Sequence, residues 1–264
     1  MEIYSVGSSS SGNSYIIKTG SMNLILDVGL SATRIIEAME RCGLQPEDVD
    51  AVLITHEHID HVRSVRAISR KCPNAVFFAS RGTVAGCSGF GYVDDERIQP
   101  VVAGDVFEIG TTVIRCFELS HDANEPIGYS VIDDCEQLTV VTDTGTITRS
   151  IYDEMRTADI LVFEANHEES ILMYGEYPYN VKMRIKSDVG HLSNVCAGEM
   201  LARLISEREK EEQLIVMLAH LSEKNNSPYQ ARITIEDILR DNGYEQGEHY
   251  YMCIAAKEGL CSPR

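Results

Sequence analysis

The sequence predicts an α+β fold in which two packed β-sheets are covered by helices on the outside. Apolar runs of strand length dominate the first half of the chain, with two helical segments between them. Strands and helices alternate in the second half. No linker, repeat or low-complexity segment divides the chain, and 264 residues fit one large domain. We therefore expect residues 1–264 to form a single domain.

The first elements of the chain are short strands followed by a helix. A serine- and glycine-rich loop, residues 7–14, lacks the helix and lysine of a P-loop, so a hairpin turn is the simpler interpretation. A helix is expected over 31–42, because Ile35 and Met39 lie on one side and Gly43 provides a stop. The opening strands are expected at residues 3–6, 15–17 and 24–26.

The later elements are recognised by apolar runs and by helix caps. One helix is expected over 61–71 and another over 194–208, with Ser193 as its N-cap. Ser227-Pro228 forms a good N-cap and first-turn pair for a last helix. Residues 80–100 are rich in glycine and loop signals. The remaining strands are expected at residues 51–54, 75–79, 106–107, 112–119, 127–132, 138–142, 160–163, 214–219 and 250–255.

Composition excludes several classes of protein. Hydrophobic residues make up 44% and charged residues 24%, which is ordinary for a globular protein. No apolar run is long enough for a membrane span, and the N-terminus lacks the basic region and apolar core of a signal peptide. We therefore expect a cytoplasmic protein. Its eight cysteines are irregularly spaced without C-x-x-C, which favours reduced thiols over a zinc finger.

The net charge of −18 argues against non-specific electrostatic binding to nucleic acid. It does not exclude a nuclease, because bound cations and a local basic patch attract phosphate against the overall field.

A histidine- and aspartate-rich turn follows the strand at 51–54. His56, His58, Asp60 and His61 fall within six residues, although the whole chain has only eight histidines. The spacing does not match H-E-x-x-H, in which the histidines are four apart on a helix. Imidazole and carboxylate together suit zinc or a similar divalent metal. Four potential ligands, joined by others, exceed the needs of one catalytic ion, so we predict half of a two-metal site.

Five acidic or imidazole side chains share a position relative to the strands, since each comes within two residues after an apolar run. They are His56, His121, Asp143, Glu164 and His220. Sites are commonly built from loops at one edge of a rigid scaffold. This regularity therefore predicts one shared site.

The order H-x-H-x-D-H, then a lone histidine, an aspartate and a late histidine resembles the metallo-β-lactamase superfamily, from Gly7 to His220. The resemblance implies a four-layer αββα sandwich and two divalent ions, zinc or manganese. One ion would be held by His56, His58 and His121, the other by Asp60, His61 and His220, with Asp143 bridging. Asp27 resembles the structural aspartate that supports the histidine turn.

Further motifs narrow the resemblance to the nucleases of that superfamily. Residues 161–167 and 190–193 are similar to two motifs of the tRNase Z group, in which a glutamate orients a proton-donating histidine. The matching pair is Glu164 and His191. Phe163 stands where the first motif has its histidine, and Asn166 replaces its threonine. The 76 residues between Asp143 and His220 leave no room for the insert of RNase J.

The chain resembles most closely a bacterial group known as YycJ or WalJ. The hallmarks are the loop 7–13, the turn 55–61 and the segments 163–168, 190–194 and 220–226. The resemblance implies a metal-dependent exonuclease that acts 5′ to 3′ on double-stranded DNA. A hydroxide bridging two metals would be the nucleophile and Asp60 would orient it. His191 would hold a phosphate or protonate the departing 3′ oxygen, with Glu164 orienting its ring.

Two groups of basic residues are candidate phosphate contacts. Arg63 and Arg66 lie on one face of the expected helix 61–71, which starts at the metal turn. A second group alternates before His191 and would share a face on an extended segment. Its members are Lys182, Arg184 and Lys186. An ordinary solvated face is the alternative for both groups.

Other residues have a simpler expected role. Tyr174, Tyr177 and Tyr179 can stack on bases, but such tyrosines more often cover a core. His167 is expected at the surface or at a cap.

Three other functions remain open on the sequence alone. The first is an RNA-processing nuclease of the tRNase Z type. The second is a small-ester or thioester hydrolase that uses the same dimetal site. Activity on DNA versus small esters would distinguish it from the nuclease. The third is a non-enzymatic regulatory binding protein, which metal analysis would test.

Overall fold

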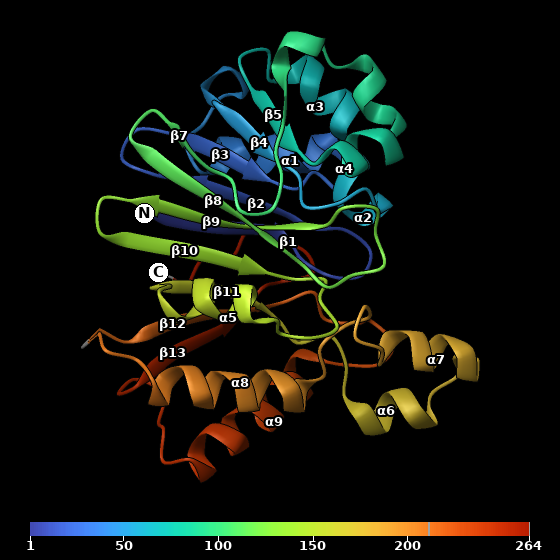
Figure 1. Ribbon diagram of the computed structural model, residues 1–264, viewed down its shortest axis with the longest axis vertical. Helices are drawn as coiled ribbons and strands as arrows, with labels where there is room; N and C mark the ends of the chain where they lie inside the picture. Colours follow the sequence, from blue (N-terminus) through green and yellow to red (C-terminus); the bar gives the residue numbers. More distant parts are fainter. Residues whose placement is uncertain (211, 264) are drawn as a thin grey trace.

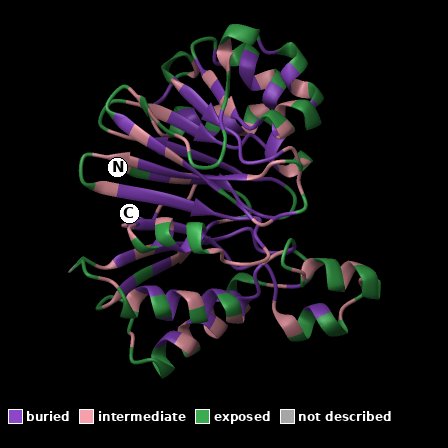
Figure 2. Cartoon of the chain, in the orientation of Figure 1, coloured by how far each residue is buried: buried purple, intermediate pink, exposed green. Residues whose placement is uncertain are grey.

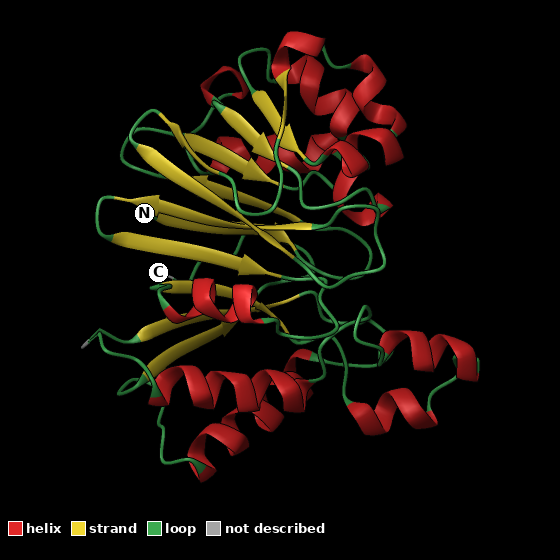
Figure 3. Cartoon of the chain, in the orientation of Figure 1, coloured by secondary structure: helices red, strands yellow, loops and turns green. Residues whose placement is uncertain are grey.

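Two β-sheets packed face to face form the centre of the molecule, and helices cover both outer faces (Figures 1 and 3). The computed structural model describes residues 1–210 and 212–263, and within these ranges one sheet has six strands and the other seven. This arrangement confirms the predicted α+β sandwich of four layers.

The first sheet has the strand order β1-β2-β3-β4-β5-β6. Its first three strands pair antiparallel and β3 to β6 run parallel. Helices α1, α3 and α4 belong to its outer side (Figure 1). The bounds are β1 (Glu2–Gly7), β2 (Ser14–Lys18), β3 (Asn23–Leu26), α1 (Ala32–Arg41), β4 (Ala51–Leu53), α2 (Ile59–Val62), α3 (Val65–Lys71), β5 (Val76–Ala79), α4 (Arg81–Gly86) and β6 (Ile98–Pro100).

The second sheet has the order β13-β12-β11-β10-β9-β8-β7. Strands β7 to β10 pair antiparallel and β10 to β13 run parallel. The bounds are β7 (Val106–Ile109), β8 (Thr112–Glu118), β9 (Ile127–Asp133), β10 (Glu136–Val141), α5 (Arg149–Arg156), β11 (Ile160–Glu164), α6 (Glu169–Tyr174), α7 (Tyr179–Ile185), α8 (Asn194–Ser206), β12 (Leu214–Ala219), α9 (Pro228–Asp241) and β13 (Tyr250–Ile254).

Strand β11 shows why the parallel strands are apolar without alternation. Ile160 and Val162 point into the core between the sheets, whereas Leu161 and Phe163 point into the core under the helices. A strand that is buried on both faces has a continuous run of apolar residues in its sequence. Burying a side chain such as Phe163 contributes about 1.5–3 kcal/mol. Its burial also explains why this position carries no polar group of the site.

The helix expected over 61–71 is two helices, α2 and α3, so that expectation is wrong. The break falls at Ser64, whose backbone N–H donates to the Val28 carbonyl at 2.9 Å instead of continuing the helix. The Ser64 hydroxyl donates to the carbonyl of Leu30. These long-range bonds redirect the chain just after the histidine turn.

The segment before His191 is also different from expectation, because residues 179–185 form helix α7 rather than an extended strand. Lys182, Arg184 and Lys186 therefore do not share a face through alternation. Helices α4, α5 and α6 lie where no helix was predicted.

Within the described ranges, no helix is both long and apolar enough to cross a membrane. All eight cysteines are free.

Close packing at Gly29 positions the histidine turn against the first sheet. A Cβ atom built on Gly29 would lie 1.5 Å from the carbonyl oxygen of Asp60, which no side chain permits. The glycine therefore lets the turn approach the backbone after β3 directly.

Candidate metal centre

The polar residues of the site follow the carboxyl ends of strands from both sheets. Asp27 follows β3, the histidine turn follows β4, His121 follows β8, Asp143 follows β10 and His220 follows β12, while Glu164 ends β11. Strand register then brings particular residues together. Leu26 pairs with Leu53, and Glu164 pairs with Ala219. Glu164 is thereby placed beside His220.

Three of these residues have a backbone conformation that is rare for residues other than glycine. Asp27, Asp143 and His220 have φ angles of 58°, 59° and 55°. Aspartate and histidine are among the residues that tolerate this region best, but the conformation persists only where the surroundings hold it. At each of these residues the positive φ angle turns the backbone at the end of the strand and so changes the direction of the side chain. Concentrated strain of this kind is typical of functional sites.

The structure brings all seven predicted metal ligands into one cluster, in which five of them are buried and His58 and Asp60 are half-buried. In one group, His121 Nε2 lies 3.3 Å from His58 Nδ1, and His56 completes the set. In the other, His220 Nε2 and His61 Nε2 lie 3.4 and 3.5 Å from Asp60 Oδ2. Within each set, the potential ligand atoms lie within 4.8 Å of one another.

Asp143 lies between the two groups. Its Oδ2 is 3.3 Å from His61 Nε2, and its Oδ1 is 3.4 Å from His220 Nε2 and 3.7 Å from His121 Nε2. One carboxylate therefore reaches the histidines of both groups.

Hydrogen bonds on the far side of the rings aim the Nε2 atoms at the centre. His61 Nδ1 donates to Asp27 at 2.7 Å, and His121 Nδ1 donates to the Gly190 carbonyl at 3.2 Å. His220 Nδ1 donates to Glu164 at 3.0 Å. Ligand histidines are commonly held in this way, which selects the tautomer and the ring direction.

Two buried atoms in the cluster lack a hydrogen-bond partner: His56 Nε2 and Asp143 Oδ2. A buried polar atom without a partner is costly and calls for an explanation, such as an ion. Both atoms belong to the sets that could hold a metal. Nitrogen and oxygen donors in this mixture fit zinc or a similar divalent metal.

A family model of the beta-lactamase superfamily domain matches residues 23–211. The chain belongs to the metallo-β-lactamase superfamily. Within it, the chain is 32% identical to Exodeoxyribonuclease YycJ of Bacillus anthracis, over 93% of this chain and 91% of that protein. It is 35% identical to Exodeoxyribonuclease WalJ of Streptococcus pneumoniae, over 89% and 87%. These matches place it in the YycJ and WalJ group of the superfamily.

A solved structure shows the same superfamily fold. The metallo-beta-lactamase fold protein YhfI from Bacillus subtilis superposes with a TM-score of 0.69, over 99% of this chain and 98% of that one, at 14% identity. At this identity the likeness concerns the fold alone.

In this member of the superfamily, Glu164 serves two histidines. Its Oε1 accepts a hydrogen bond from His191 Nδ1 at 2.8 Å and from His220 Nδ1 at 3.0 Å. Its Oε2 accepts from the backbone N–H of Thr144 at 3.1 Å. Glu164 is fully buried, whereas the His191 side chain is 19% exposed. His191 can therefore face a substrate while its other nitrogen is held.

Neighbouring histidines lower the pKa of two carboxyl groups in the cluster, Asp60 and Glu164. Burial opposes ionisation of Asp60, but the charge of His61 and a hydrogen bond from His220 outweigh it and lower its pKa. Burial also opposes ionisation of Glu164, and the neighbouring His191 more than offsets it, so its pKa is lowered.

The surroundings shift the pKa of His56 and His121 in the opposite direction to that of His220. Burial lowers the pKa of His56 and His121. Burial also disfavours the charged form of His220, but Asp143 and the bonds to Asp60 and Glu164 prevail and raise its pKa to about 10. An ion binding here would displace such a proton.

Several supporting residues were not identified from the sequence. Asn13 Nδ2 lies 3.1 Å from His61 Nε2, and its backbone N–H donates to the Asp60 carbonyl. Thr55 donates to Asp27 through both its hydroxyl and its N–H. Asn13 and Thr55 belong to the loop and turn that carry the family resemblance, which is the only sequence signal for them.

His167 is buried, so the expectation of a surface histidine is wrong. It is 1% exposed and its segment pairs with Ser193 in an isolated bridge. Burial lowers its pKa to about 4. Sequence reasoning missed this because the burial comes from a distant segment.

The two basic groups have different surroundings. Arg63 and Arg66 are exposed, and the Arg66 guanidinium lies 3.8 Å from the centre of the Tyr92 ring. In the second group, Lys182 Nζ donates to the carbonyls of Met173 and Gly175, and Lys186 pairs with Glu169. Arg184 pairs with Asp122, next to His121.

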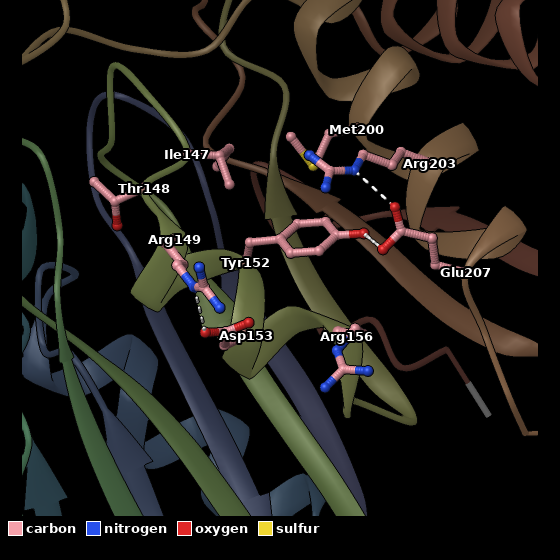
Figure 4. Close-up of a pocket in the computed structure, with 9 residues that line it drawn as sticks. All are labelled: Ile147, Thr148, Arg149, Tyr152, Asp153, Arg156, Met200, Arg203 and Glu207. Atoms are coloured by element: carbon pink, nitrogen blue, oxygen red, sulfur yellow. Dashed lines mark hydrogen bonds and ion pairs between the residues drawn. The ribbon is translucent and has the colours of Figure 1, made fainter.

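A surface cavity of about 570 Å³ lies between α5 and α8, but no residue of the metal cluster lines it (Figure 4). Its charged groups are largely paired with each other. Arg149 pairs with Asp153, and Glu207 accepts from both Arg203 and the Tyr152 hydroxyl. These charges therefore largely offset one another.

Proposed function

We propose that this chain is a dinuclear metal-dependent phosphodiesterase that degrades DNA as a 5′-to-3′ exonuclease. The observation that carries the proposal is the strand-end cluster, in which Asp143 reaches the histidines of two adjacent ligand sets. Relatives named exodeoxyribonucleases, similar over nearly the whole chain, support DNA as the substrate and the exonuclease activity.

The proposed ligands are those of the two sets, with Asp143 shared. Divalent ions in such a site supply Lewis acidity at phosphate oxygens and a water that ionises near neutral pH. The first set is His56, His58 and His121; the second is Asp60, His61 and His220.

Asp60 and His191 have the proposed proton-handling roles. The Asp60 side chain is 18% exposed while that of Asp143 is 3% exposed, so Asp60 can accept a hydrogen bond from the attacking water. His191 Nδ1 is engaged with Glu164, which leaves Nε2 to carry a proton to the departing 3′ oxygen. Glu164 stabilises the charged imidazole and sets its direction.

Arg63 and Arg66 are the proposed phosphate contacts nearest the histidine turn. Both are exposed, and among the described residues no ion pair is found for either. Lys182 and Lys186 make internal bonds in the structure, so they contribute less to this proposal than the sequence suggested.

The decisive experiment compares end-labelled DNA and RNA with purified protein in zinc or manganese. We expect a 5′ label on duplex DNA to be released early as a mononucleotide and a 3′ label to persist. Cleavage of RNA alone would support the tRNase Z type of activity instead. Hydrolysis of esters or thioesters without any cleavage of DNA would contradict the proposal.

A further inference from the structure

Residues 169–189 form an arm, made of α6, α7 and their connections, that stands away from the sheets (Figure 1). Helix α6 buries only Leu172, and α7 buries none of its residues. The arm is mostly exposed in Figure 2. Half of the twelve large exposed apolar or aromatic side chains found in the described chain belong to it. They are Ile171, Met173, Tyr174, Tyr179, Met183 and Val189.

Two of the three tyrosines in the arm, Tyr174 and Tyr179, do not cover a core, contrary to the simpler expectation, whereas Tyr177 is half-buried. Tyr174 is 92% exposed and Tyr179 is 70% exposed. Ile171 lies one turn before Tyr174, and Met183 lies one turn after Tyr179, so each ring shares a helix face with an apolar neighbour. Exposed apolar groups gathered in this way mark a binding surface.

The arm is held in shape by its own lysines. Lys182 Nζ donates to the carbonyls of Met173 and Gly175 at 2.8 and 2.7 Å, at the end of α6. Lys186 Nζ lies 3.0 Å from Glu169 at the start of α6. These bonds tie the two helices together, so the rings are presented from a defined hairpin.

The base of the arm is bonded to the walls of the metal centre. The Asp188 carbonyl accepts from the Ser120 hydroxyl at 2.8 Å, and the Val189 carbonyl accepts from the Asp122 N–H at 3.1 Å. The His191 N–H donates to the Ile185 carbonyl at 2.8 Å. The base of the arm therefore adjoins the segments that carry His121 and His191. A DNA strand that enters the site would meet the arm.

We propose that this arm is a stacking platform for unpaired nucleotides at the end of the substrate, with Tyr174 and Tyr179 as the rings. The inference rests on the proposed nuclease function. A blunt duplex end offers only the outer face of its terminal base pair, whereas an unpaired strand offers the faces of successive bases. Aromatic side chains bind these faces without regard to sequence. The arm selects a frayed or single-stranded end over a blunt duplex.

Charge favours nucleic acid over a second copy of the chain as the occupant. The arm has three basic and three acidic residues, so its own formal net charge is zero. The net charge of −18 comes from the rest of the chain. A polyanion is repelled less at the arm than over the rest of the molecule. Lys182 and Arg184 lie among the apolar residues of α7, whereas the cores of homodimer interfaces are depleted of charge.

The test measures binding of a single-stranded DNA oligonucleotide containing 2-aminopurine, whose fluorescence reports stacking. EDTA is present so that the strand stays intact. Replacing both rings, Tyr174→Ala with Tyr179→Ala, should weaken binding by about 5- to 150-fold for each ring that stacks. The Tyr174→Phe, Tyr179→Phe variant should bind like wild type, because the ring does the stacking. Tyr251→Ala, at an exposed tyrosine of β13, serves as the control and should have no effect.

Hydrolysis of bis(p-nitrophenyl) phosphate in the presence of metal separates the two proposals. It should be unchanged in the arm variants, since this small diester does not reach the rings. Unaltered DNA binding in the double alanine variant, with wild-type DNA cleavage, overturns the platform alone. If the double alanine variant loses DNA binding and the wild-type protein does not cleave DNA, the stacking proposal stands and the proposed nuclease function is wrong. A wild-type dimer that the alanine variant converts to monomers also overturns the platform, because the arm then docks a second copy.

Discussion

The metal cluster and the arm adjoin each other but hold their side chains in opposite ways. In the cluster, His56, His61 and Glu164 are completely buried, and the rings are aimed by bonds to carboxylates and carbonyls. In the arm, the rings of Tyr174 and Tyr179 extend into solvent. The comparison indicates that groups handling charge are fixed before substrate arrives, whereas groups that meet variable bases are left adaptable.

Backbone strain separates the two regions as well. Three of the four non-glycine residues with positive φ in the described chain are Asp27, Asp143 and His220, all at the cluster. The surrounding bonds must hold each of them against a cost of about 1–3 kcal/mol. The arm has none of these residues, and its shape depends on ordinary helices, on the Lys182 and Lys186 bonds and on the backbone bonds at its base.

The largest effect is expected from Asp143→Asn. Asparagine tolerates the same backbone conformation, so the change removes the charge without adding strain. Since the carboxylate reaches both ligand groups, nuclease activity should fall to background and metal content should drop. Elemental analysis and a labelled-DNA assay measure both.

Asp134→Asn is the matched control for that substitution. Asp134 also has a positive φ, of 52°, but lies exposed in the turn between β9 and β10. It should retain full activity and metal content. Full metal content and activity in Asp143→Asn would contradict the shared site.

His191→Ala should keep the metals and the fold while lowering kcat by about 10²–10⁴, the range for a lost general acid. The mutant should recover much of its rate on a p-nitrophenyl phosphodiester, whose leaving group needs little protonation. Equal loss on both substrates would assign His191 to phosphate binding or structure. Glu164→Gln should also weaken metal binding, because Glu164 holds His220 as well.

Asp27→Asn should weaken metal affinity by about 10–100-fold, the usual cost of losing a group that orients a ligand histidine. The carboxylate accepts from His61 Nδ1 at 2.7 Å and from Thr55, so the amide would disturb the ring and the turn together. Titration against a chelating dye measures the affinity. An unchanged affinity would show that the His61 ring is held by other contacts.

Arg63→Ala combined with Arg66→Ala should weaken DNA binding moderately and reduce the salt dependence. Each lost phosphate contact lowers the slope of log affinity against log salt by about one. Lys182→Ala should act differently, by loosening the arm without that change in slope, because its ammonium already binds two carbonyls. Binding isotherms across a salt series distinguish the two results. An unchanged slope in the double arginine variant would remove both residues from the interface.

The smallest effect is expected on stability in the arm. Tyr174→Ala and Tyr179→Ala should each change the free energy of unfolding by no more than about 0.5 kcal/mol, as for most surface positions. Phe163→Ala, in the core beneath the helices, should cost about 3–5 kcal/mol. Denaturant unfolding compares them. A large loss at either tyrosine would mean that the ring is structural.

Much of the fold was predictable because its signals are local. The apolar runs that became β3, β4 and β10 to β13 can be read along the chain, and so can the caps at Ser193 and Ser227. The histidine turn was recognisable for the same reason, since four candidate ligands are contiguous. Their grouping with His121, Asp143 and His220 followed from position after strands and from the family resemblance.

The sequence by itself determined every described strand except β6, which lies in a segment expected to be loop, and the residue types that gather at the strand ends. Tertiary structure alone decided which ring nitrogen faces the centre, that Asn13 reaches His61, that the chain breaks its helix at Ser64 and that α7 is helical. It also decided that Tyr174 and Tyr179 of the arm are exposed. Local patterns depend on neighbours along the chain, whereas these features depend on contacts between segments far apart in sequence, such as the 48 residues that separate Asn13 from His61.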